Sequence, residues 1–409
     1  MKILFVHQNF PGQYVHLARH LGTIPGNEVV FITQRTTAYL PGVRKIVYKP
    51  ARSVTKGVHH YIRDTESGIL NAQNVARVAL NLKASGYVPD VMLAHNGWGE
   101  LWYLKDVYPD TPLIGYLEFF YKVKGADVGF EPGSSQSFDV APRVRTKNLG
   151  NLLALHTADI GQTPTWWQRS LYPKEYQPKI HVVHEGIDSE VVAPDSQARF
   201  AVPGTGIEVG CEDEVITYVA RNLEPYRGFP SFMRSLVGIL AARPRARVLV
   251  VGGDETSYGP KAPGNRPFRE LLLEELGDRL DVSRVHFLGK VPYGSYLKIL
   301  QVSSVHVYLT YPFVLSWSML EAMSAGCVVV GSSTAPVQEV IRHGENGWLV
   351  DIFDIEAIAR QVVAVLADRH AQQGIRQAAR RHILENFDLR TICLPAQLNM
   401  LRIAMHHRG

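Results

Sequence analysis

Two arginines stand close together in a segment that follows an apolar run. Residues 220–228 read ARNLEPYRG, and the apolar residues before them predict a buried strand. Two guanidinium groups at one place repel each other unless an anion lies between them, and their planar donors match the oxygens of a diphosphate. Fixed positive charge also stabilises a departing diphosphate. Arg221 and Arg227 therefore predict an anion site, and the alternative is a pair of solvated arginines on a loop.

A second candidate site follows another apolar run. Residues 308–326 read YLTYPFVLSWSMLEAMSAG, which predicts a strand that ends near Leu309, a loop, and a helix that starts around Ser316. The free amides at the start of a helix bind phosphate. Glu321 would lie inside this helix, where a carboxylate can hold the two vicinal hydroxyls of a ribose. A surface glutamate in an apolar helix is the alternative.

The first half of the chain holds three weaker candidates. Gly12 follows the first predicted strand and would open a helix, so backbone amides there can approach an anion, although an ordinary turn explains this glycine equally well. His95 and Trp98 also follow a predicted strand. Trp98 could stack on a ring of a ligand and His95 could line a ligand site, while an ordinary loop histidine is the simpler interpretation. No G-x-G-x-x-G sequence is present, so a dinucleotide fingerprint is missing.

The elements that must position these residues alternate along the chain. Short, uniformly apolar runs are separated by stretches with helical spacing, which is typical of parallel strands covered on both faces. Repeated strand–helix–strand units predict an α/β fold with two doubly wound sheets. The expected strands are residues 3–6, 29–33, 91–94, 113–117, 160–162 and 181–184, followed by 215–220, 247–251, 286–288, 306–309, 327–330 and 347–350.

The two series of strands predict two domains, as does the length of 409 residues. Between the series, residues 188–213 are polar, contain prolines and lack a sustained pattern. We therefore expect an N-terminal domain at 1–190, a linker at 191–212 and a C-terminal domain at 213–387. The tail, residues 388–409, has a helical pattern but no obvious place in a second sheet that is already complete.

The composition excludes several classes of protein. Hydrophobic residues make up 46% and charged residues 20%, as in a globular chain without long disorder. Three cysteines without metal-ligand spacing argue against a disulfide framework or a zinc site. The first apolar run is too short for a signal peptide and no run of 18 apolar residues occurs, so we expect a cytoplasmic protein.

The net charge of +5 is mild and does not require nucleic acid as a partner. One stretch of the first half is richer in basic residues than the rest. It is most simply a solvated loop region, and the alternative is a surface for peripheral contact with an anionic membrane. Its basic residues are Arg35, Arg44, Lys45, Lys49, Arg52 and Lys56.

The order of motifs resembles that of glycosyltransferases of the GT-B architecture, and it is similar to the retaining enzymes of family 4. The resemblance covers nearly the whole chain. It implies two Rossmann-like domains whose parallel sheets face a central cleft, with a C-terminal helix that crosses back to the N-terminal domain. The motifs that carry it are the two-arginine segment, VVGG at 250–253, VHFLGKVP at 285–292, SMLEAMSAG at 318–326, Glu339, HGENGWLV at 343–350 and HEGID at 184–188.

The resemblance implies that the second domain holds a nucleotide-sugar donor. Arg221 and Arg227 match the family's basic pair for the diphosphate, although the family usually has arginine and lysine. Glu321 matches the second glutamate of an E-x7-E motif, which takes the ribose hydroxyls. The other matches are Gly12 in the glycine loop of the acceptor domain, the backbone at Lys290, Val291 and Pro292 beside the nucleobase, and Val314, Leu315 and Ser316 in the loop that faces the phosphates and the sugar.

Two positions depart from the family pattern. The first glutamate of E-x7-E would stand at 313, where this chain has Phe313. In the family that glutamate helps to hold the sugar, so the phenylalanine affects which donor sugar is expected. Glu118 follows the strand predicted at 113–117, near a position where the family often has a histidine. Its carboxylate could accept the proton of the acceptor or hydrogen-bond the reacting sugar, and a structural carboxylate near a helix start is the alternative.

The resemblance implies transfer of a sugar to a glycan, lipid-linked or small-molecule hydroxyl, with retention of configuration. On the acceptor side, Trp98 could stack on a sugar and His95 could line the acceptor site. UDP-sugars are favoured over GDP-sugars as donors. No Asp-x-Asp follows a predicted strand end, so we expect no metal ion and no other cofactor. The alternatives are a nucleotide-sugar epimerase or phosphorylase on the same fold, and a two-lobed sugar- or nucleotide-binding protein without chemistry.

Overall fold

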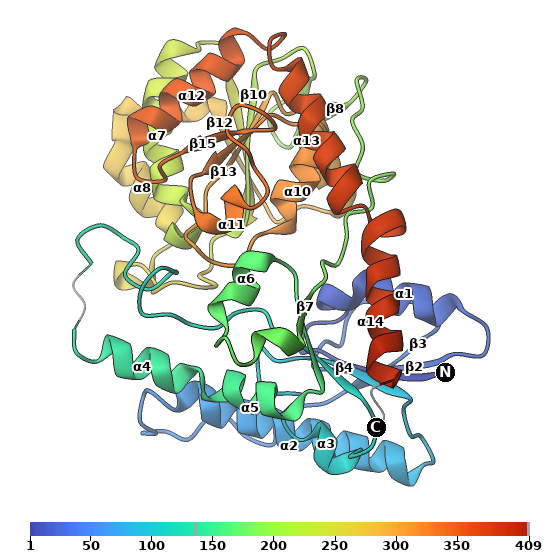
Figure 1. The fold of residues 1–409 in the computed structure, drawn as a ribbon. Helices are drawn as coiled ribbons and strands as arrows, with labels where there is room; N and C mark the ends of the chain where they lie inside the picture. The colour runs from blue at the N-terminus through green and yellow to red at the C-terminus, as the bar shows by residue number, and fades with distance from the viewer. Residues whose placement is uncertain (135–136, 407–409) are drawn as a thin grey trace. The chain divides into compact units, whose positions relative to one another are not determined.

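A computed structural model describes residues 1–134 and 137–406 of the chain (Figure 1). The chain divides into two compact units. The first consists of Met1–Gly186 together with Leu389–Gly409, and the second is Ile187–Asp388. Each unit is a parallel sheet with helices packed on it, which is the two-domain α/β architecture expected from the sequence.

The first unit is built on a seven-stranded sheet with the order β3-β2-β1-β4-β5-β6-β7, and every neighbouring pair is parallel. Its first strand is central, because β1 pairs with both β2 and β4, and this position buries Ile3, Leu4 and Phe5 completely. The strands are β1 (Lys2–Val6), β2 (Glu28–Thr33), β3 (Val43–Val47), β4 (Val91–His95), β5 (Leu113–Tyr116), β6 (Ile160–Thr163) and β7 (Ile180–Val182).

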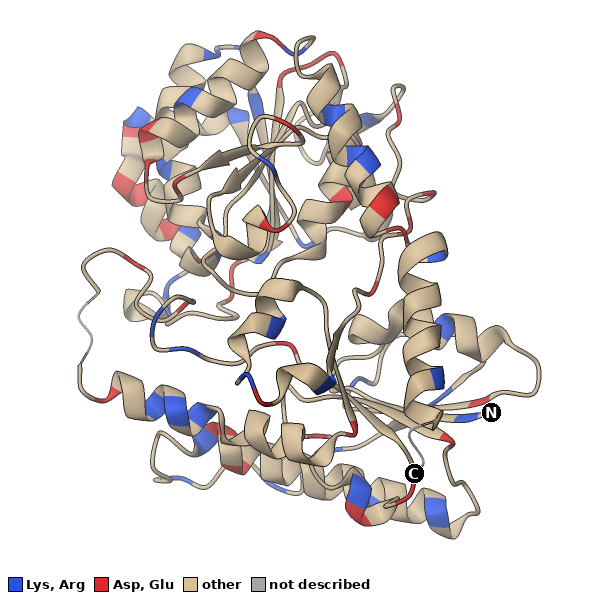
Figure 2. Cartoon of the chain, viewed as in Figure 1, with Lys and Arg blue, Asp and Glu red and all other residues tan. Residues whose placement is uncertain are grey.

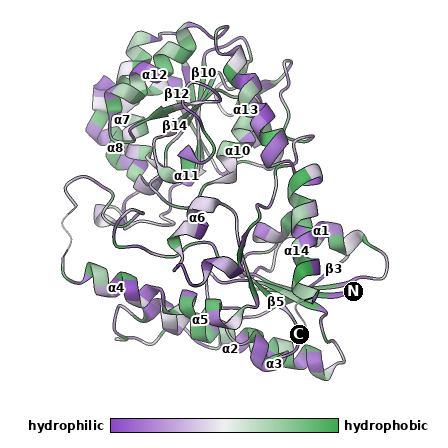
Figure 3. Ribbon diagram, in the orientation of Figure 1, coloured by the Kyte–Doolittle hydropathy of each residue, from purple (hydrophilic) through white to green (hydrophobic). Residues whose placement is uncertain are grey.

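Helices of the first unit connect these strands and cover the sheet. Hydrophobic residues follow the strands and the inward faces of the helices (Figure 3). The helices are α1 (Val15–Thr23), α2 (Arg63–Ala84), α3 (Leu104–Val107), α4 (Val140–Lys147), α5 (Leu149–Thr157) and α6 (Trp166–Leu171).

The second unit repeats the architecture with a six-stranded parallel sheet of order β12-β11-β10-β13-β14-β15. Its strands are β10 (Val215–Asn222), β11 (Arg247–Gly253), β12 (Val285–Gly289), β13 (Val305–Tyr308), β14 (Val329–Ser332) and β15 (Trp348–Val350). Its helices are α7 (Phe229–Ala242), α8 (Phe268–Leu276), α9 (Tyr293–Gln301), α10 (Trp317–Ser324), α11 (Ala335–Gln338), α12 (Ile355–Ala367) and α13 (Gln373–Asn386).

The prediction of a linker at 191–212 was wrong in part, because this segment contains a β-hairpin. The antiparallel strands β8 (Arg199–Val202) and β9 (Ile207–Gly210) form a two-stranded sheet of their own. Phe200, Val202 and Val209 from this hairpin are buried in a hydrophobic cluster with residues of β10 and β11. The segment therefore packs as part of the second unit, and the alternation of apolar residues over only four positions was too short to reveal it.

The basic stretch of the first unit was also misread as a loop, because part of it is β3 at the edge of the sheet. Arg44 and Lys45 are strand residues. Charged side chains are common on edge strands, where they prevent pairing with other chains. Lys45 Nζ donates to the carbonyls of Thr36 and Ala38, so it holds the preceding loop as well.

The tail helix belongs to the first unit, as the resemblance implied. After a short π-helical turn at Leu389–Cys393, helix α14 (Leu394–His406) packs Met400, Leu401 and Ala404 into the core of the first unit. The chain thus crosses between the units twice, after Gly186 and after Asp388.

Gly186 explains part of the HEGID motif. It has φ +95°, and a Cβ there would come within 2.8 Å of the Leu389 Cα. Gln397 on α14 donates from Nε2 to the carbonyls of His184 and Glu185, which fixes the tail against the motif.

Within the part of the chain that the structure describes, no helix is both long enough and apolar enough to cross a bilayer.

Candidate active site

The candidate site of the first unit lies at the carboxyl edge of the seven-stranded sheet. His7 directly follows β1, His95 is the last residue of β4, and Glu118 is the second residue after β5. Because β1, β4 and β5 are neighbours in the sheet, their ends bring these three side chains together. Ligands of doubly wound folds bind beyond this edge.

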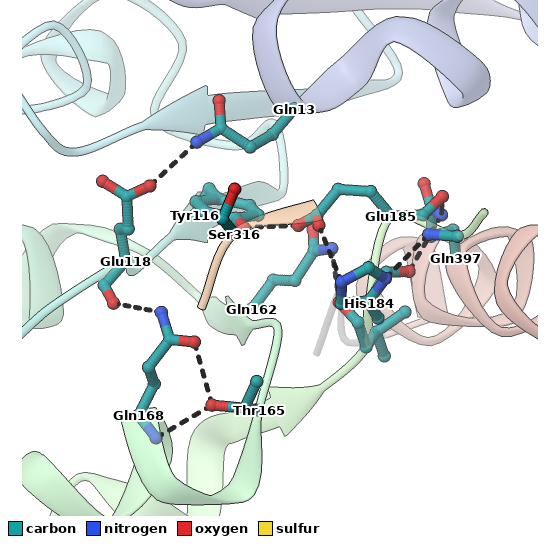
Figure 4. Close-up of polar contacts among 12 residues, drawn as sticks. Gln13, Tyr116, Glu118, Gln162, Thr165, Gln168, His184, Glu185, Ser316 and Gln397 are labelled. Atoms are coloured by element: carbon teal, nitrogen blue, oxygen red, sulfur yellow. Dashed lines mark hydrogen bonds and ion pairs between the residues drawn. The ribbon is translucent and has the colours of Figure 1, made fainter. Parts of the chain in front are cut away.

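A chain of hydrogen bonds runs from His7 to Glu118. The backbone N–H of Asn9 donates to His7 Nδ1 at 2.9 Å, so the ring proton lies on Nε2. His7 Nε2 then donates to Gln13 Oε1 at 2.6 Å, and Gln13 Nε2 donates to Glu118 Oε1 at 2.9 Å (Figure 4). Because each donor has one acceptor, the chain fixes the direction of every bond and the orientation of the carboxylate.

The backbone of Glu118 is held from the other side. Gln168 donates from Nε2 to the Glu118 carbonyl at 2.6 Å (Figure 4). Thr165, the N-cap of α6, orients this glutamine by donating to its Oε1 and accepting from its backbone N–H. The Glu118 side chain is 30% exposed. Both the backbone and the carboxylate of Glu118 are thus held in place, while the side chain stays partly open to solvent. Such a carboxylate is suited to contact a ligand.

His95 is completely buried and stacks between Trp98 and Tyr116, with ring centroids 5.1 and 5.0 Å away. Its Nδ1 accepts from the Gly97 N–H, so its proton lies on Nε2, which is 4.0 Å from a Glu118 oxygen. Burial, with a smaller contribution from His7, lowers the pKa of His95 well below its usual value. His95 is therefore neutral and supports the site from behind, while Trp98 is only partly buried.

Gly12 has a steric function in this chain of hydrogen bonds. Its φ is +54°, and a Cβ at this position would lie 2.5 Å from His7 Nε2, the atom that donates to Gln13. The residue thus permits both the turn into α1 and the close approach of the His7 ring. Sequence reasoning assigned Gly12 to an anion and did not detect its contact with His7.

We expect Gly12→Ala to lower both stability and activity, because the new methyl group would displace the His7 ring. Gly26→Ala is the matched control, since Gly26 also has positive φ, +82°, but no atom within 4 Å of its Cβ position. The control should lose only about 1 kcal/mol from the strained backbone. Urea unfolding and activity measurements compare the two variants, and equal losses of both properties would contradict the steric explanation.

The candidate site of the second unit begins just after β10. Arg227 is buried, and its Nη1 donates to Thr310 Oγ1 and to the Val314 carbonyl, both at 2.9 Å. Its guanidinium also lies over the Tyr258 ring, 5.2 Å from the centroid. The structure therefore brings Arg227 to the 314–316 loop. Arg221 is exposed, and its side chain has no hydrogen bond or ion pair among the residues described.

Glu224 lies between the two arginines in sequence and was missed as a site residue. It is fully buried, and its Oε2 accepts from the backbone N–H groups of Ser257, Tyr258 and Gly259. This carboxylate holds the loop that carries Tyr258 next to Arg227. Its only signal in the sequence is a charged residue in a segment where the neighbours are apolar or aromatic.

Phe313 is buried among aromatic rings at the position where the family pattern has a glutamate. Its ring centroid is 5.0 Å from that of Tyr258 and 5.6 Å from that of Tyr226, and Tyr226 stacks on Tyr311 at 5.1 Å. Phe313 thus contributes an aromatic ring to this part of the second unit, where the family pattern has a carboxylate.

Helix α10 begins where the sequence placed it. Ser316 is its N-cap and accepts from the backbone N–H of Ser318 at 3.3 Å. The backbone N–H of Ser316 donates to the Tyr308 hydroxyl, and Leu315 is buried. Val314, Leu315 and Ser316 thus form a loop tied to Arg227 at one end and to β13 at the other.

Glu321 accepts hydrogen bonds from two tyrosines of α9. Tyr293 donates to Oε1 at 2.8 Å and Tyr296 to Oε2 at 2.6 Å. Burial raises the pKa of Glu321, while the two hydroxyls act in the opposite direction. Each carboxylate oxygen keeps a further lone pair for a ligand. The residues predicted to lie beside the nucleobase are Lys290, Val291 and Pro292, which immediately precede α9. Lys290 forms an exposed ion pair with Glu255.

Two family models divide the chain in the same way as the structure. Residues 25–192 match the model described as glycosyl transferase family 4 group, and residues 213–368 match that of glycosyl transferases group 1. Together the matches include β2 to β7 of the first sheet and all six strands of the second. The chain is a glycosyltransferase of the family 4 type.

Related proteins support this conclusion. D-inositol 3-phosphate glycosyltransferase of Kribbella flavida is 26% identical over 384 residues, covering 90% of this chain and 84% of that protein. N-acetyl-alpha-D-glucosaminyl L-malate synthase of Bacillus anthracis is 30% identical over 104 residues, which are 25% of this chain and 27% of that protein. The similarity is thus distributed over most of the glycosyltransferase.

Solved structures share the fold of the glycosyltransferase. Sucrose-phosphate synthase from Thermosynechococcus elongatus has a TM-score of 0.72 at 18% identity, with 99% of each chain covered. HepE from Anabaena, solved in complex with UDP and glucose, has a TM-score of 0.69 at 18% identity, with 98% of this chain and 100% of that chain covered. The GT-B expectation is confirmed.

Proposed function

We propose that this glycosyltransferase moves a sugar from UDP to a hydroxyl acceptor with retention of configuration and without a metal ion. The observation that carries the proposal is the fixed position of Arg227 against the 314–316 loop, where Val314 and Thr310 accept from its guanidinium. This arrangement places a permanent positive charge beside the start of α10, which is a favourable place for a diphosphate. UDP is favoured because it is the nucleotide in the complexes of HepE.

The second unit would bind the donor through three contacts. Arg227 and the exposed Arg221 pair with the diphosphate, and their charge stabilises it as it leaves. Glu321 accepts hydrogen bonds from the ribose hydroxyls. The backbone of Lys290, Val291 and Pro292 lies beside the base. Among the described residues, no group of three histidine, cysteine, aspartate or glutamate side chains has an arrangement that would hold a metal ion.

The first unit would bind the acceptor at the edge that carries Glu118. In our proposal the Glu118 carboxylate accepts the hydrogen bond of a sugar hydroxyl at the reaction centre, and Trp98 stacks on a sugar ring. His95 and Gln13 support this arrangement without touching substrate.

The experiment that tests the proposal is a thermal-shift panel with UDP, GDP, ADP, CMP, dTDP and NADH. We expect UDP to stabilise the protein most and NADH to have no effect. The transfer assay is then run with excess EDTA and with magnesium, and the anomeric configuration of the product is read by NMR. A strict requirement for a divalent cation, an inverted product or a larger shift with another nucleotide would each overturn the corresponding part of the proposal.

Replacement of Tyr296 by phenylalanine should shift the acid limit of UDP binding to higher pH. The pKa of Glu321 is already raised by burial, and Tyr296→Phe removes one of the two hydrogen bonds that oppose this rise. Only the ionised carboxylate accepts from both ribose hydroxyls, so affinity falls as the pH falls through this pKa. Calorimetric titration of both proteins from pH 5 to 8 measures the difference. The same pH dependence in variant and wild type would contradict the assignment of Glu321 to the ribose.

We also propose that the basic residues of the first unit attract an anionic membrane that carries a lipid-linked acceptor. Arg52 is paired with Glu66 and Lys45 is bound to carbonyls. The main contributors are therefore Arg35, Arg44, Lys49 and Lys56. Their replacement by glutamine should weaken sedimentation with vesicles that contain phosphatidylglycerol. Unchanged sedimentation would refute this contact.

A further inference from the structure

A cavity of about 590 Å³ lies in the second unit, away from the residues assigned to the donor. One wall is a face of α13, which appears with blue basic positions in Figure 2, and the opposite wall is the start of the hairpin segment and the end of α10. Its volume is in the range of small-molecule binding sites. Its lining residues of interest are Asp195, Cys211, Arg369, Arg376, Arg380 and Arg381.

The lining of the cavity is strongly basic. It contains four arginines and a single carboxylate, that of Asp195. Among the described residues, none of these arginines has a carboxylate within 4.0 Å, whereas most other arginines of the second unit form such a pair. None of the four guanidinium groups is therefore paired directly with a carboxylate, and Asp388 acts on Arg380 only from a greater distance.

Backbone carbonyls fix the positions of three of the arginines. Arg376 donates to the carbonyls of Gly326 at 2.6 Å and Ser304 at 2.8 Å. Arg380 donates to the Ser324 carbonyl at 2.6 Å, and Arg369 to the Cys211 carbonyl. A carbonyl satisfies the N–H groups but does not cancel the charge, so the guanidinium groups are held rigidly while their field persists.

The electrostatics agree with a cluster of like charges. Burial lowers the pKa of Arg376, and the nearby Arg369 also lowers it. Burial lowers the pKa of Arg380 as well, while Asp388 acts in the opposite direction. The Nε of Arg369 is buried and has no acceptor among the residues described. Arg381 is exposed, and its side chain has no hydrogen bond or ion pair in the same part of the chain. Donors thus remain for a ligand.

We propose that this cavity, which we call the arginine pocket, binds a small multivalent anion of the phosphate-ester or diphosphate class. Guanidinium groups held by carbonyls match phosphate oxygens in geometry and charge. Leu384 and Pro194 add apolar contact for the organic part of such a molecule. This site is independent of the donor site, because none of the proposed donor residues lines it.

Cys211 supplies a local readout, because it lines the arginine pocket and is partly exposed, whereas Cys327 and Cys393 are buried. The probe is inorganic pyrophosphate, with inorganic phosphate in a parallel series and sodium chloride at matched ionic strength. The rate of Cys211 alkylation by iodoacetamide is followed by mass spectrometry. We expect pyrophosphate to slow alkylation in a saturable manner, and more effectively than phosphate. Chloride should have little effect.

Arg381→Glu tests the pocket without disturbing the fold, since this side chain is exposed. It should raise the half-saturating pyrophosphate concentration about tenfold or more, as expected for loss of a charge-assisted hydrogen bond. Arg402→Glu, an equal charge change on α14 in the first unit, should leave it unchanged. Arg227→Ala should also retain protection, which separates this site from the donor site.

Two outcomes would overturn the arginine pocket. The first is alkylation of wild-type Cys211 at the same rate with and without pyrophosphate. The second is equal protection in Arg381→Glu and Arg402→Glu, which would show only a general effect of salt on the thiol.

Discussion

Replacement of Glu118 by glutamine should lower kcat by about 10²–10⁴ while the affinity for UDP stays unchanged. Glutamine preserves the size of the side chain but has lost the charge, and one of its two terminal groups can only donate. Gln13 Nε2 donates to Glu118 Oε1, so the amide would turn its oxygen toward Gln13 and present its NH₂ group to the ligand. Initial-rate kinetics with a UDP-sugar, together with calorimetric titration of UDP, measure the two effects.

Gln13→Ala is the matched comparison for this variant. It leaves the Glu118 carboxylate intact but removes the hydrogen bond that orients it, so we expect a smaller loss of kcat than in Glu118→Gln. The thermal midpoint should change little in either protein, because the Glu118 side chain is 30% exposed. A Glu118→Gln enzyme with wild-type kcat would show that this carboxylate is structural.

Replacement of Arg227 by alanine should abolish the thermal shift with UDP and lower kcat by about 10²–10³. The structure ties this guanidinium, a fixed positive charge, to the loop before α10 through Val314 and Thr310. Its removal deprives the departing diphosphate of a cation held in place. Two acceptors also lose their donor, so the free energy of unfolding should fall by about 1–3 kcal/mol.

Two further variants separate charge from stability in this result. Arg227→Lys keeps the charge but has one donating group in place of a planar fork, so it should recover part of the UDP shift. Arg221→Ala removes the exposed member of the pair and should weaken UDP binding without a loss of stability. If Arg227→Ala keeps a full UDP shift, the donor diphosphate binds elsewhere.

Local patterns in the sequence predicted every strand of the two large sheets except β3, and also the start of α10. Uniform apolarity over four or five residues is sufficient for a strand buried on both faces, as in Ile3, Leu4 and Phe5 of β1. The same rule missed β3 and the β8–β9 hairpin, because an edge strand carries charge and a hairpin of four-residue strands buries only alternate side chains.

The sequence by itself thus determined the α/β architecture, the two-domain division and the family. It also predicted Arg227, Ser316 and Glu321 as site residues, because Arg227 follows a recognisable strand and the other two lie at the start of or inside a recognisable helix. Which other residues come together depends on the order of the strands in a sheet, and no local sequence pattern contains that order. Gln13 and Glu118 are 105 positions apart and meet only because β1, β4 and β5 are adjacent in the sheet.

The tertiary structure also determined which residues contact particular glycines and charged side chains. The contact between Gly12 and His7, the loop held by Glu224 and the arginine pocket all arise from groups brought together by packing. In the pocket, α13 places its arginines beside Ser324 and Gly326 at the end of α10, about fifty residues earlier in the chain. Hydrophobic periodicity determines which faces are buried, but only the assembled sheets and helices determine which polar groups then meet.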